Sequence, residues 1–326
     1  MPEKRKFKRL IQDILLSPLA YLSALCLRKV RRVGLSDLPR CRWVLNHTGC
    51  FPLLDHYYEP LFRTDRLKGK LATPRSLPGI DFQFSRQIQL LETLATYSEE
   101  SSKLPKTEIE PERFHYDNPT YREGDAAFLY AMIRHLKPAR IIEIGCGNST
   151  LLAREAWSQN KQENPAQSCR HTCIEPYENP WLEKLPVEVI RDPLENINFE
   201  IFKELKPNDL LFIDSSHIIR PGGDVLKIYL EVLPLLAPGV IVHVHDIFSP
   251  RDYLERWLVD DVKFWNEQYL LEAFLSCNPH FEIMAALNTL KMDHFEKLKQ
   301  VCPLLHEKSE PGSFYIRVAD NATDQR

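Results

Sequence analysis

The stretch Ile141-Ile-Glu-Ile-Gly-Cys-Gly-Asn-Ser-Thr150 indicates the fold of this chain. Its apolar first half has the composition of a buried strand, and its two glycines stand where the strand must turn sharply into a helix. A hydroxyl residue at its end can cap that helix. A backbone without Cβ atoms also lets a ligand approach closely, although a plain turn needs glycine too. If the loop binds a ligand, the contacts predicted within it are Gly145, Gly147 and Ser149.

Strands alternate with helices from about Glu110 onward, which predicts a parallel sheet built from βαβ units. The predicted strands are Arg140–Ile144, His171–Glu175, Val187–Arg191, Asp209–Asp214, Gly239–His245, Phe281–Leu287 and Ser313–Val318. Helices are predicted over Glu123–His135, Val225–Leu236 and a segment that begins with Asp260–Leu275. The spacing of the last two strands fits a closing hairpin better than another crossover. The predicted fold class is therefore α/β, with a Rossmann-like, seven-stranded, mostly parallel sheet and helices on both faces.

Composition narrows the classes of function. The chain has 326 residues, of which 44% are hydrophobic and 27% charged, as in an ordinary globular protein. A net charge of −3 argues against a broad electrostatic grip on nucleic acid and favours a small or weakly charged substrate. Among eight scattered cysteines the only close pair, Cys169 and Cys173, lacks a second pair of zinc ligands. These features predict a reduced, cytoplasmic protein.

The N-terminus combines basic and apolar residues. An apolar run from Ile14 to Leu27 lies between two basic clusters, the first of which is Lys4, Arg5, Lys6, Lys8 and Arg9. The second cluster and the large Leu25 argue against a cleaved secretion signal. The run of about fourteen residues is shorter than the roughly 20 that span a bilayer. Residues 1–30 are predicted to form a basic amphipathic helix, which lies on the inner face of a membrane through residues 4–32 or packs on protein.

Residues 31–110 are predicted to be a loop-rich region, in which a substrate-binding or lid function stays open, and residues 111–326 to be the sheet domain. Within the first of these, the segment Gly49–Phe62 is rich in aromatic and titratable groups. Such a segment can line a pocket, or it can be an ordinary crossing of the core.

Acidic residues stand at the ends of three predicted strands. Glu143 lies two residues before Gly145, where a carboxylate can reach the cationic end of a ligand. Glu175 ends the second strand, where it can accept hydrogen bonds from both hydroxyls of a ribose. Asp192 stands at an adenine-side position, or is simply a turn residue. The third glycine of a dinucleotide fingerprint is absent, which counts against NAD and favours an adenosyl ligand without phosphates.

These features, together with Leu211-Phe-Ile-Asp-Ser-Ser-His217, resemble the class I S-adenosylmethionine-dependent methyltransferases. The branch most similar is a small-molecule or glycan branch that has Ile-Asp-x-x-His after the fourth strand and His-Asp after the fifth. The resemblance covers about residues 111–320 and leaves out the N-terminal third. It implies an S-adenosylmethionine cofactor whose methyl group faces the ends of these two strands. The predicted cofactor-binding residues are Glu143, Gly145, Gly147, Ser149, Glu175, Asp192 and Asp214.

Two polar clusters converge at that edge of the sheet, Asp214-Ser-Ser-His217 and His243-Val-His-Asp246. Methyl transfer to oxygen or nitrogen needs a nucleophile without its proton, and histidine titrates near neutral pH. The predicted catalytic residues are therefore His217, His245 and Asp246, whereas His243 lies deeper. A weaker alternative is a divalent cation held by Asp214, His245 and Asp246.

Aromatic and polar side chains flank these clusters. The segment Tyr253–Gln268 can form a lid over the acceptor, and Tyr116, Tyr121 and Asp125 approach from the other side. The predicted function is methyl transfer to a hydroxyl or amine of a small molecule, a glycan or a lipid-linked precursor. Two alternatives stay open, a Rossmann-like oxidoreductase using NAD and a non-catalytic protein that docks on a membrane or partner.

Overall fold

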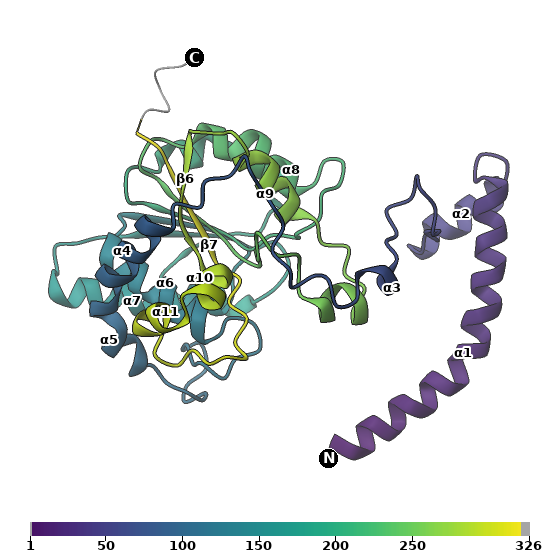
Figure 1. The fold of residues 1–326 in the computed structure, drawn as a ribbon, viewed down its shortest axis with the longest axis horizontal. Helices are drawn as coiled ribbons and strands as arrows, with labels where there is room; N and C mark the ends of the chain where they lie inside the picture. Colours follow the sequence, from purple (N-terminus) through teal and green to yellow (C-terminus); the bar gives the residue numbers. More distant parts are fainter. Residues whose placement is uncertain (1, 321–326) are drawn as a thin grey trace. The chain divides into compact units, whose positions relative to one another are not determined.

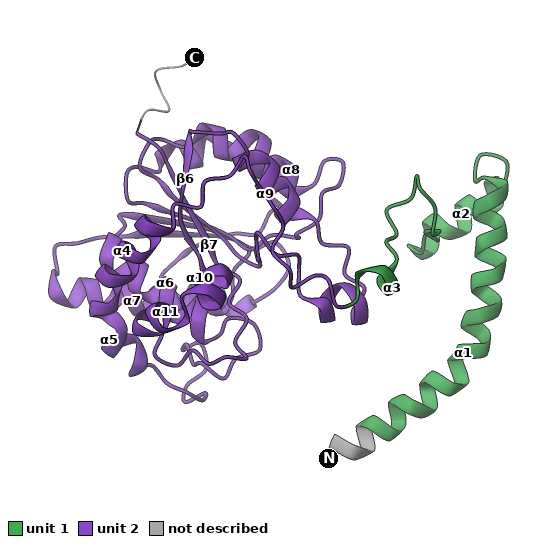
Figure 2. Ribbon diagram, viewed as in Figure 1, with its two compact units in different colours: residues 1–68 green, residues 69–326 purple. Residues whose placement is uncertain are grey.

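The computed structural model describes residues 2–320, with side chains from residue 6 onward. Two compact units divide the chain, residues 1–68 and residues 69–326 (Figure 2). The side chains of Lys4 and Arg5, which belong to the predicted N-terminal basic cluster, lie outside the described residues.

A seven-stranded sheet forms the centre of the second unit (Figure 1). Its order is β3-β2-β1-β4-β5-β7-β6, with β1 to β5 parallel and β7 antiparallel to both of its neighbours. The strands are β1 (Arg140–Ile144), β2 (Arg170–Ile174), β3 (Glu188–Ile190), β4 (Leu210–Ile213), β5 (Ile241–Val244), β6 (Phe281–Ala286) and β7 (Phe314–Val318). The predicted α/β class and the antiparallel ending are confirmed. Strand order reverses between β1 and β4, where the carboxyl ends of parallel strands open a ligand crevice.

Both faces of the sheet are buried. Because successive side chains of a strand point to opposite sides, neighbouring residues belong to different apolar clusters. Ile141 and Phe212 belong to one apolar cluster, Ile142 and Leu211 to the other. Helices on the first face are α4 (Phe84–Leu94), α6 (Glu123–Leu136), α7 (Asn148–Glu163), α10 (Leu287–Asp293) and α11 (Phe295–Val301). Those on the second are α8 (Asp224–Lys227) and α9 (Glu267–Leu275). This double cover explains why the central strands are almost entirely apolar.

The second unit begins at Gly69, although the sequence prediction placed its start at residue 111. The reason is α4, whose residues Leu91 and Leu94 are part of the first apolar cluster. Its Gln87 also accepts a hydrogen bond at Oε1 from the backbone N–H of Ala286 on β6, at 2.9 Å. The segment before residue 111 therefore belongs in part to the sheet domain.

Two predicted helices differ from the structure. Val225–Leu236 is divided among α8, a π-helical turn over Ile228–Val232 and a 3₁₀ turn over Leu233–Leu235. The segment predicted from Asp260 becomes α-helical only at Glu267, because the backbone N–H groups of Asn266 and Glu267 both donate to the carbonyl oxygen of His217. A π-helical turn over Arg256–Asp260 precedes it.

Shorter elements complete the chain. They are α2 (Pro39–Thr48), α3 (Thr64–Leu67), α5 (Ser98–Ser102) and 3₁₀ turns at Ala95–Tyr97, Pro180–Lys184, Leu194–Asn196 and Phe199–Glu204.

The first unit is dominated by α1 (Pro2–Val33), a helix of 32 residues. Its window Leu10–Leu27 contains one charged residue, Asp13, and none of the window is buried. By length and composition this helix can cross a membrane, so the prediction that its apolar run is too short is wrong. The error arose because the run was counted only from Ile14, beyond Asp13.

The aromatic segment Gly49–Phe62 belongs to the same unit. Its Tyr57 and Tyr58 are 91% and 86% exposed. A pocket-lining role for this segment stays a prediction.

Candidate active site

The two glycines after β1 differ in what they face. Gly145 has a φ of +80°, and a Cβ built there would overlap the carbonyl oxygen of Asp214, so the close packing of this loop on the end of β4 requires glycine. A Cβ on Gly147 would have only Asn179 Nδ2 nearby, at 3.6 Å, and Gly147 lines a cavity. Protein packing thus accounts for Gly145, whereas Gly147 keeps space open for a ligand.

Glu143 does not line either cavity at the sheet edge, contrary to the prediction that it contacts the cofactor. Its side chain is 1% exposed, accepts a hydrogen bond from the Thr150 hydroxyl and lies 3.3 Å from His171 Nε2. The Thr150 oxygen in turn accepts the Gly147 N–H at 3.1 Å. Glu143 therefore positions the glycine loop from inside, and Thr150, rather than Ser149, bonds to its backbone.

Glu175 and Asp192, the other two strand-end acids, have different surroundings. Glu175 lines the cavity, and its carboxylate accepts backbone N–H bonds from Cys146, Tyr177 and Glu178 at 3.2, 3.1 and 2.9 Å. These bonds fix the carboxylate at the position predicted for ribose recognition. Asp192 is exposed and lines none of the cavities found among the described residues, so the structure does not support its predicted adenine contact.

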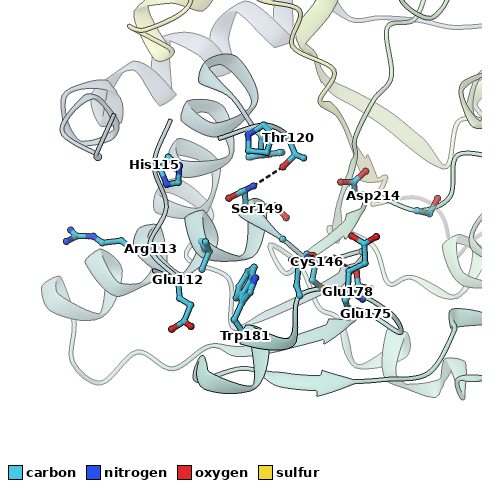
Figure 3. Close-up of a pocket in the computed structure, with 18 of the residues that line it drawn as sticks. Glu112, Arg113, His115, Thr120, Cys146, Ser149, Glu175, Glu178, Trp181 and Asp214 are labelled. Atoms are coloured by element: carbon cyan, nitrogen blue, oxygen red, sulfur yellow. Dashed lines mark hydrogen bonds between the residues drawn. The ribbon is translucent and has the colours of Figure 1, made fainter. Parts of the chain in front are cut away.

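The first cavity has a volume of about 610 Å³ and runs from Glu175 past the glycine loop to Asp214 (Figure 3). Its walls also include Ser149 at the start of α7, Tyr121 and Trp181. Tyr116, in contrast, lies in the core, where its hydroxyl donates to the carbonyl oxygen of Ser101. The residues brought together from the predicted cofactor set are Gly145, Gly147, Ser149, Glu175 and Asp214.

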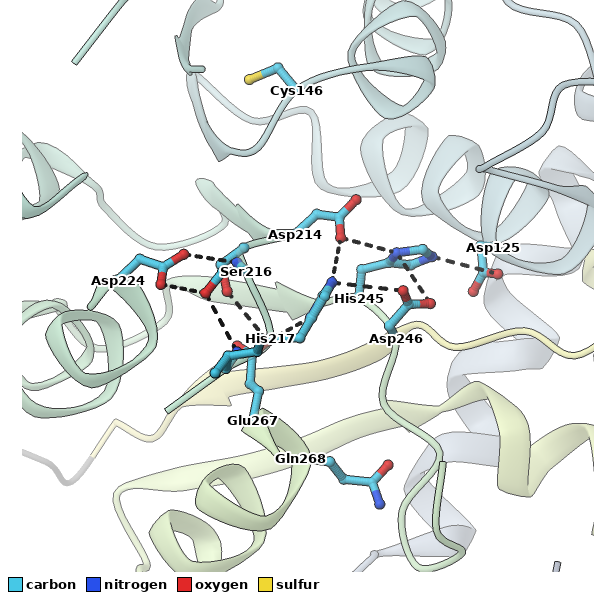
Figure 4. Close-up of polar contacts among 12 residues, drawn as sticks. Asp125, Cys146, Asp214, Ser216, His217, Asp224, His245, Asp246, Glu267 and Gln268 are labelled. Carbon is cyan, nitrogen blue, oxygen red and sulfur yellow. Dashed lines mark hydrogen bonds and ion pairs between the residues drawn. The ribbon is translucent and has the colours of Figure 1, made fainter. Parts of the chain in front are cut away.

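A cluster of carboxylates and imidazoles stands at the end of this cavity (Figure 4). His217 Nδ1 lies 2.8 Å from Glu267, and its Nε2 lies 3.2 Å from Asp214 and 3.7 Å from Asp246. His245 Nδ1 lies 3.5 and 3.7 Å from the same two aspartates. On its other side, His245 Nε2 is 3.9 Å from Asp125. The two predicted catalytic histidines therefore share two aspartates.

Both histidines carry a proton at neutral pH. Burial alone would lower the pKa of His217, but Asp214 and Glu267 raise it to about 10. In the same way, burial opposes the charge on His245, but Asp246 and Asp214 raise its pKa well above the ordinary value. The prediction that these histidines act as bases is thus not supported, because an imidazolium has no lone pair to accept a proton.

The two aspartates have opposite shifts. Burial opposes ionisation of Asp214, but His245 and His217 hold its pKa well below the usual range, and its side chain still reaches solvent with 37% of its surface. Burial raises the pKa of Asp246. With Asp125 and Glu267 the cluster has four carboxylates and two imidazoliums, which leaves two negative charges when all are ionised.

The stability of the protein should depend on pH through His217. Its pKa of about 10, against 6.5 for an ordinary histidine, means that its charged form adds stability that is complete below pH 6.5 and lost as pH rises toward 10. In a chelating buffer we expect urea unfolding to show the free energy of unfolding falling through this window. The limiting contribution of one proton is about 1.4 kcal/mol per pH unit. His217→Gln should reduce the slope of the free energy of unfolding against pH by the contribution of one proton. An unchanged slope would contradict the raised pKa of His217.

His243 belongs to the core. It is fully buried, stacks on Tyr315 with ring centroids 4.1 Å apart and meets Phe212 edge-on at 4.6 Å. Burial holds its pKa well below the ordinary value, so it is neutral.

A second cavity of about 690 Å³ adjoins the first. The two share Pro119, Thr120, Asp214, His217 and Trp265. His245, Asp246 and Asp125 line only the second, together with Trp257 from the predicted lid segment. The ring of Trp265 lies 4.3 Å from that of His217, centroid to centroid. A molecule in the first cavity and another in the second would therefore meet at Asp214 and His217.

Sequence reasoning missed several residues of this site. Glu267, which orients His217, was identified only as part of a lid. The stretch His306–Pro311 also lines the second cavity and carries no local signal, since it comes together with β5 only through the antiparallel β7.

A family model described as a methyltransferase domain matches residues 142–247, from β1 through β5. With the strand order and the cavity at its switch point, this match identifies a methyltransferase domain with the class I, Rossmann-like fold within the second unit.

Individual relatives are distant. An uncharacterized protein of Archaeoglobus fulgidus is 26% identical over 169 residues, which are 47% of this chain and 73% of that protein. The MycE methyltransferase of the mycinamycin pathway, solved with Mg and SAH, is 13% identical, with a TM-score of 0.33, over 72% of this chain and 56% of its own. CalS11, a TDP-rhamnose 3′-O-methyltransferase, is 12% identical, with a TM-score of 0.34, over 74% of this chain and 99% of its own.

Proposed function

We propose that the protein transfers a methyl group from S-adenosylmethionine in the first cavity to a hydroxyl or amine of a small molecule, glycan or lipid-linked precursor in the second. The observation that carries this proposal is that the cavities share Asp214 and His217. A donor and an acceptor bound on either side of these residues are brought face to face, which converts a bimolecular step into an intramolecular one.

The cofactor supplies an activated methyl group, and the residues of this chain orient it. Glu175 would accept hydrogen bonds from the ribose hydroxyls. Gly147, which has no side chain, would let the ligand lie close to the backbone. The ionised Asp214 and the net negative charge around it favour a cationic group at the junction of the cavities. These roles reduce the predicted cofactor set of seven residues to the five that line the first cavity.

Asp246 is the proton acceptor in this proposal. It lines the acceptor cavity, and burial raises its pKa, so it is the carboxylate of the cluster best suited to take a proton. His217 and His245 act as positioning residues that hold Asp214 and Asp246 in place through charge-assisted contacts.

A divalent cation can also occupy this cluster. Oxygen and nitrogen atoms of Asp214, His217 and Asp246 lie within 4.8 Å of one another, so His217 takes the place that the prediction gave to His245. Glu267 at Nδ1 would orient His217 as carboxylates orient metal-bound imidazoles, with Nε2 facing the two aspartates. Such an ion would stabilise a developing alkoxide and would replace the Nε2 proton.

The experiment is a turnover assay on an extract of cells that lack the gene, in which the acceptor accumulates. Addition of protein and S-adenosylmethionine should form S-adenosylhomocysteine and a species heavier by one methylene, both measured by mass spectrometry. Parallel reactions with EDTA and with Mg²⁺ test the cation. Consumption of NAD without formation of S-adenosylhomocysteine would favour the oxidoreductase alternative instead.

The helix α1 supports a location at a membrane surface. Its apolar window Leu10–Leu27 contains no buried residue and is flanked by basic side chains, which favour anionic lipid headgroups. The full chain should float with liposomes that contain anionic lipid. Leu15→Glu/Leu19→Glu should abolish flotation, because each charge opposes burial in the acyl region. Leu230→Glu, at a leucine equally exposed in the second unit, is the matched control. Equal flotation of all three proteins would contradict membrane binding by α1.

A further inference from the structure

Charged side chains of both signs line the second cavity, and the acidic ones are already engaged within the protein. Glu255 accepts the backbone N–H of Gly69 at 2.7 Å, and Glu310 accepts the amide of Asn288 at 3.2 Å. Glu123 and Asp125 have partners too, since Glu123 lies 3.8 Å from His306 and Asp125 accepts two backbone N–H bonds.

Three of the basic side chains are in the opposite situation, whereas a fourth, Arg122, lies 3.6 Å from Asp117. Arg256, Lys263 and Lys308 line the same cavity, and none has a carboxylate within 4.0 Å among the residues that the structure describes. Lys263 Nζ instead lies over two indoles, 3.9 Å from the ring centroid of Trp265 and 4.7 Å from that of Trp257. The guanidinium of Arg256 also lies over the ring of Trp257, 5.7 Å from its centroid. Three cations without acidic partners thus face an open cavity.

The cavity is therefore polarised. At its inner end, next to the first cavity, stand the carboxylates around His217, with a net negative charge. Lys263 stands near this end, because the ring of Trp265 contacts both His217 and Lys263. A molecule with an anionic end would fit in one orientation only, since the reverse orientation brings its charge against the carboxylates.

We propose that the methyl acceptor carries an anionic group, a phosphate or carboxylate, that is bound by Arg256, Lys263 and Lys308. An apolar ring face of the same molecule packs on Trp257 and Trp265, and its hydroxyl or amine points to Asp246. The inference rests on the proposed function and adds the substrate class. It also revises the expectation of a weakly charged substrate, since a net charge of −3 conceals three cations without acidic partners in one cavity.

The test is calorimetry on the full chain saturated with S-adenosylhomocysteine. Glucose 1-phosphate, glucuronate and glucose serve as probes that share a ring and differ only in carrying a phosphate, a carboxylate or no charge. We expect at least one anionic probe to bind and glucose to bind at least tenfold more weakly. The tighter of the two anionic probes identifies phosphate or carboxylate as the preferred group.

Substitutions test whether the anionic probe binds at Arg256 and Lys263. Arg256→Met/Lys263→Met should weaken the anionic probe by tenfold or more and leave the affinity for S-adenosylhomocysteine and the melting temperature unchanged. Lys161→Met is the matched control, because Lys161 also lies over an indole, that of Trp157, but outside the cavity. Equal binding of all three probes, or an equal loss in Lys161→Met, would overturn the inference. Failure of S-adenosylhomocysteine to bind at the outset would instead refute the proposed function.

Discussion

Gly147→Val should abolish binding of S-adenosylhomocysteine, with a loss of affinity of 100-fold or more in calorimetry. The side chain would fill the space that Gly147 leaves open in the first cavity, where the protein itself offers only Asn179 Nδ2 at 3.6 Å. A ligand that lies close to this backbone would be displaced, because the valine side chain places about two methyl groups in the space that the ligand needs. Because no buried neighbour is disturbed, we expect the melting temperature to stay near that of the wild type.

Gly145→Ala provides the contrast. Its Cβ would overlap the carbonyl oxygen of Asp214, so this smaller substitution should lower the melting temperature by separating the loop from the end of β4. If Gly147→Val bound S-adenosylhomocysteine as the wild type does, the loop would be an ordinary turn and the first cavity would not hold the cofactor there.

Asp246→Asn should lower methyl transfer by a factor of about 10² to 10⁴, the usual contribution of a positioned proton acceptor. The change removes the charge and the basicity but keeps the shape. Asn also tolerates the left-handed backbone of this position, where φ is +58°, so folding should be preserved. Binding of S-adenosylhomocysteine should persist, because Asp246 lines only the acceptor cavity.

Asp192→Asn is the matched control for this variant. It removes the same charge from an exposed aspartate that lines none of the cavities found among the described residues. Turnover is measured as S-adenosylhomocysteine formed in the extract assay. Equal turnover of both variants and the wild type would show that Asp246 accepts no proton in the reaction, and restoration of Asp246→Asn by added Mg²⁺ would assign the role to a metal instead.

The strands could be predicted from the sequence because their signals are local. The central strands are short runs rich in apolar residues, and β1 coincides with its predicted range Arg140–Ile144. The glycine after it is equally local, since the left-handed φ of Gly145 is a property of one residue. Glu175 followed from its place at the end of a strand. These features depend on neighbours in the chain and on the rules of parallel sheets.

The roles of the charged residues could not be predicted in this way. His217 looked like a base because a histidine in isolation titrates near neutral pH, whereas Asp214 and Glu267, the latter fifty positions along the chain, raise its pKa and keep it protonated. Glu143 looked like a ligand contact because its outward direction was assumed, and the buried His171 and Thr150 draw it inward. The unpaired cations of the acceptor cavity depend on which acids find partners elsewhere, which only the folded chain determines.

The most direct test of the central claim is calorimetry of the wild-type chain with S-adenosylhomocysteine and, separately, with NAD. The glycine loop with its open Gly147, the ribose-side Glu175 and the absence of a third loop glycine predict saturable binding of S-adenosylhomocysteine and no measurable heat with NAD. Binding of NAD without binding of S-adenosylhomocysteine would contradict the proposal that S-adenosylmethionine is the cofactor of the first cavity.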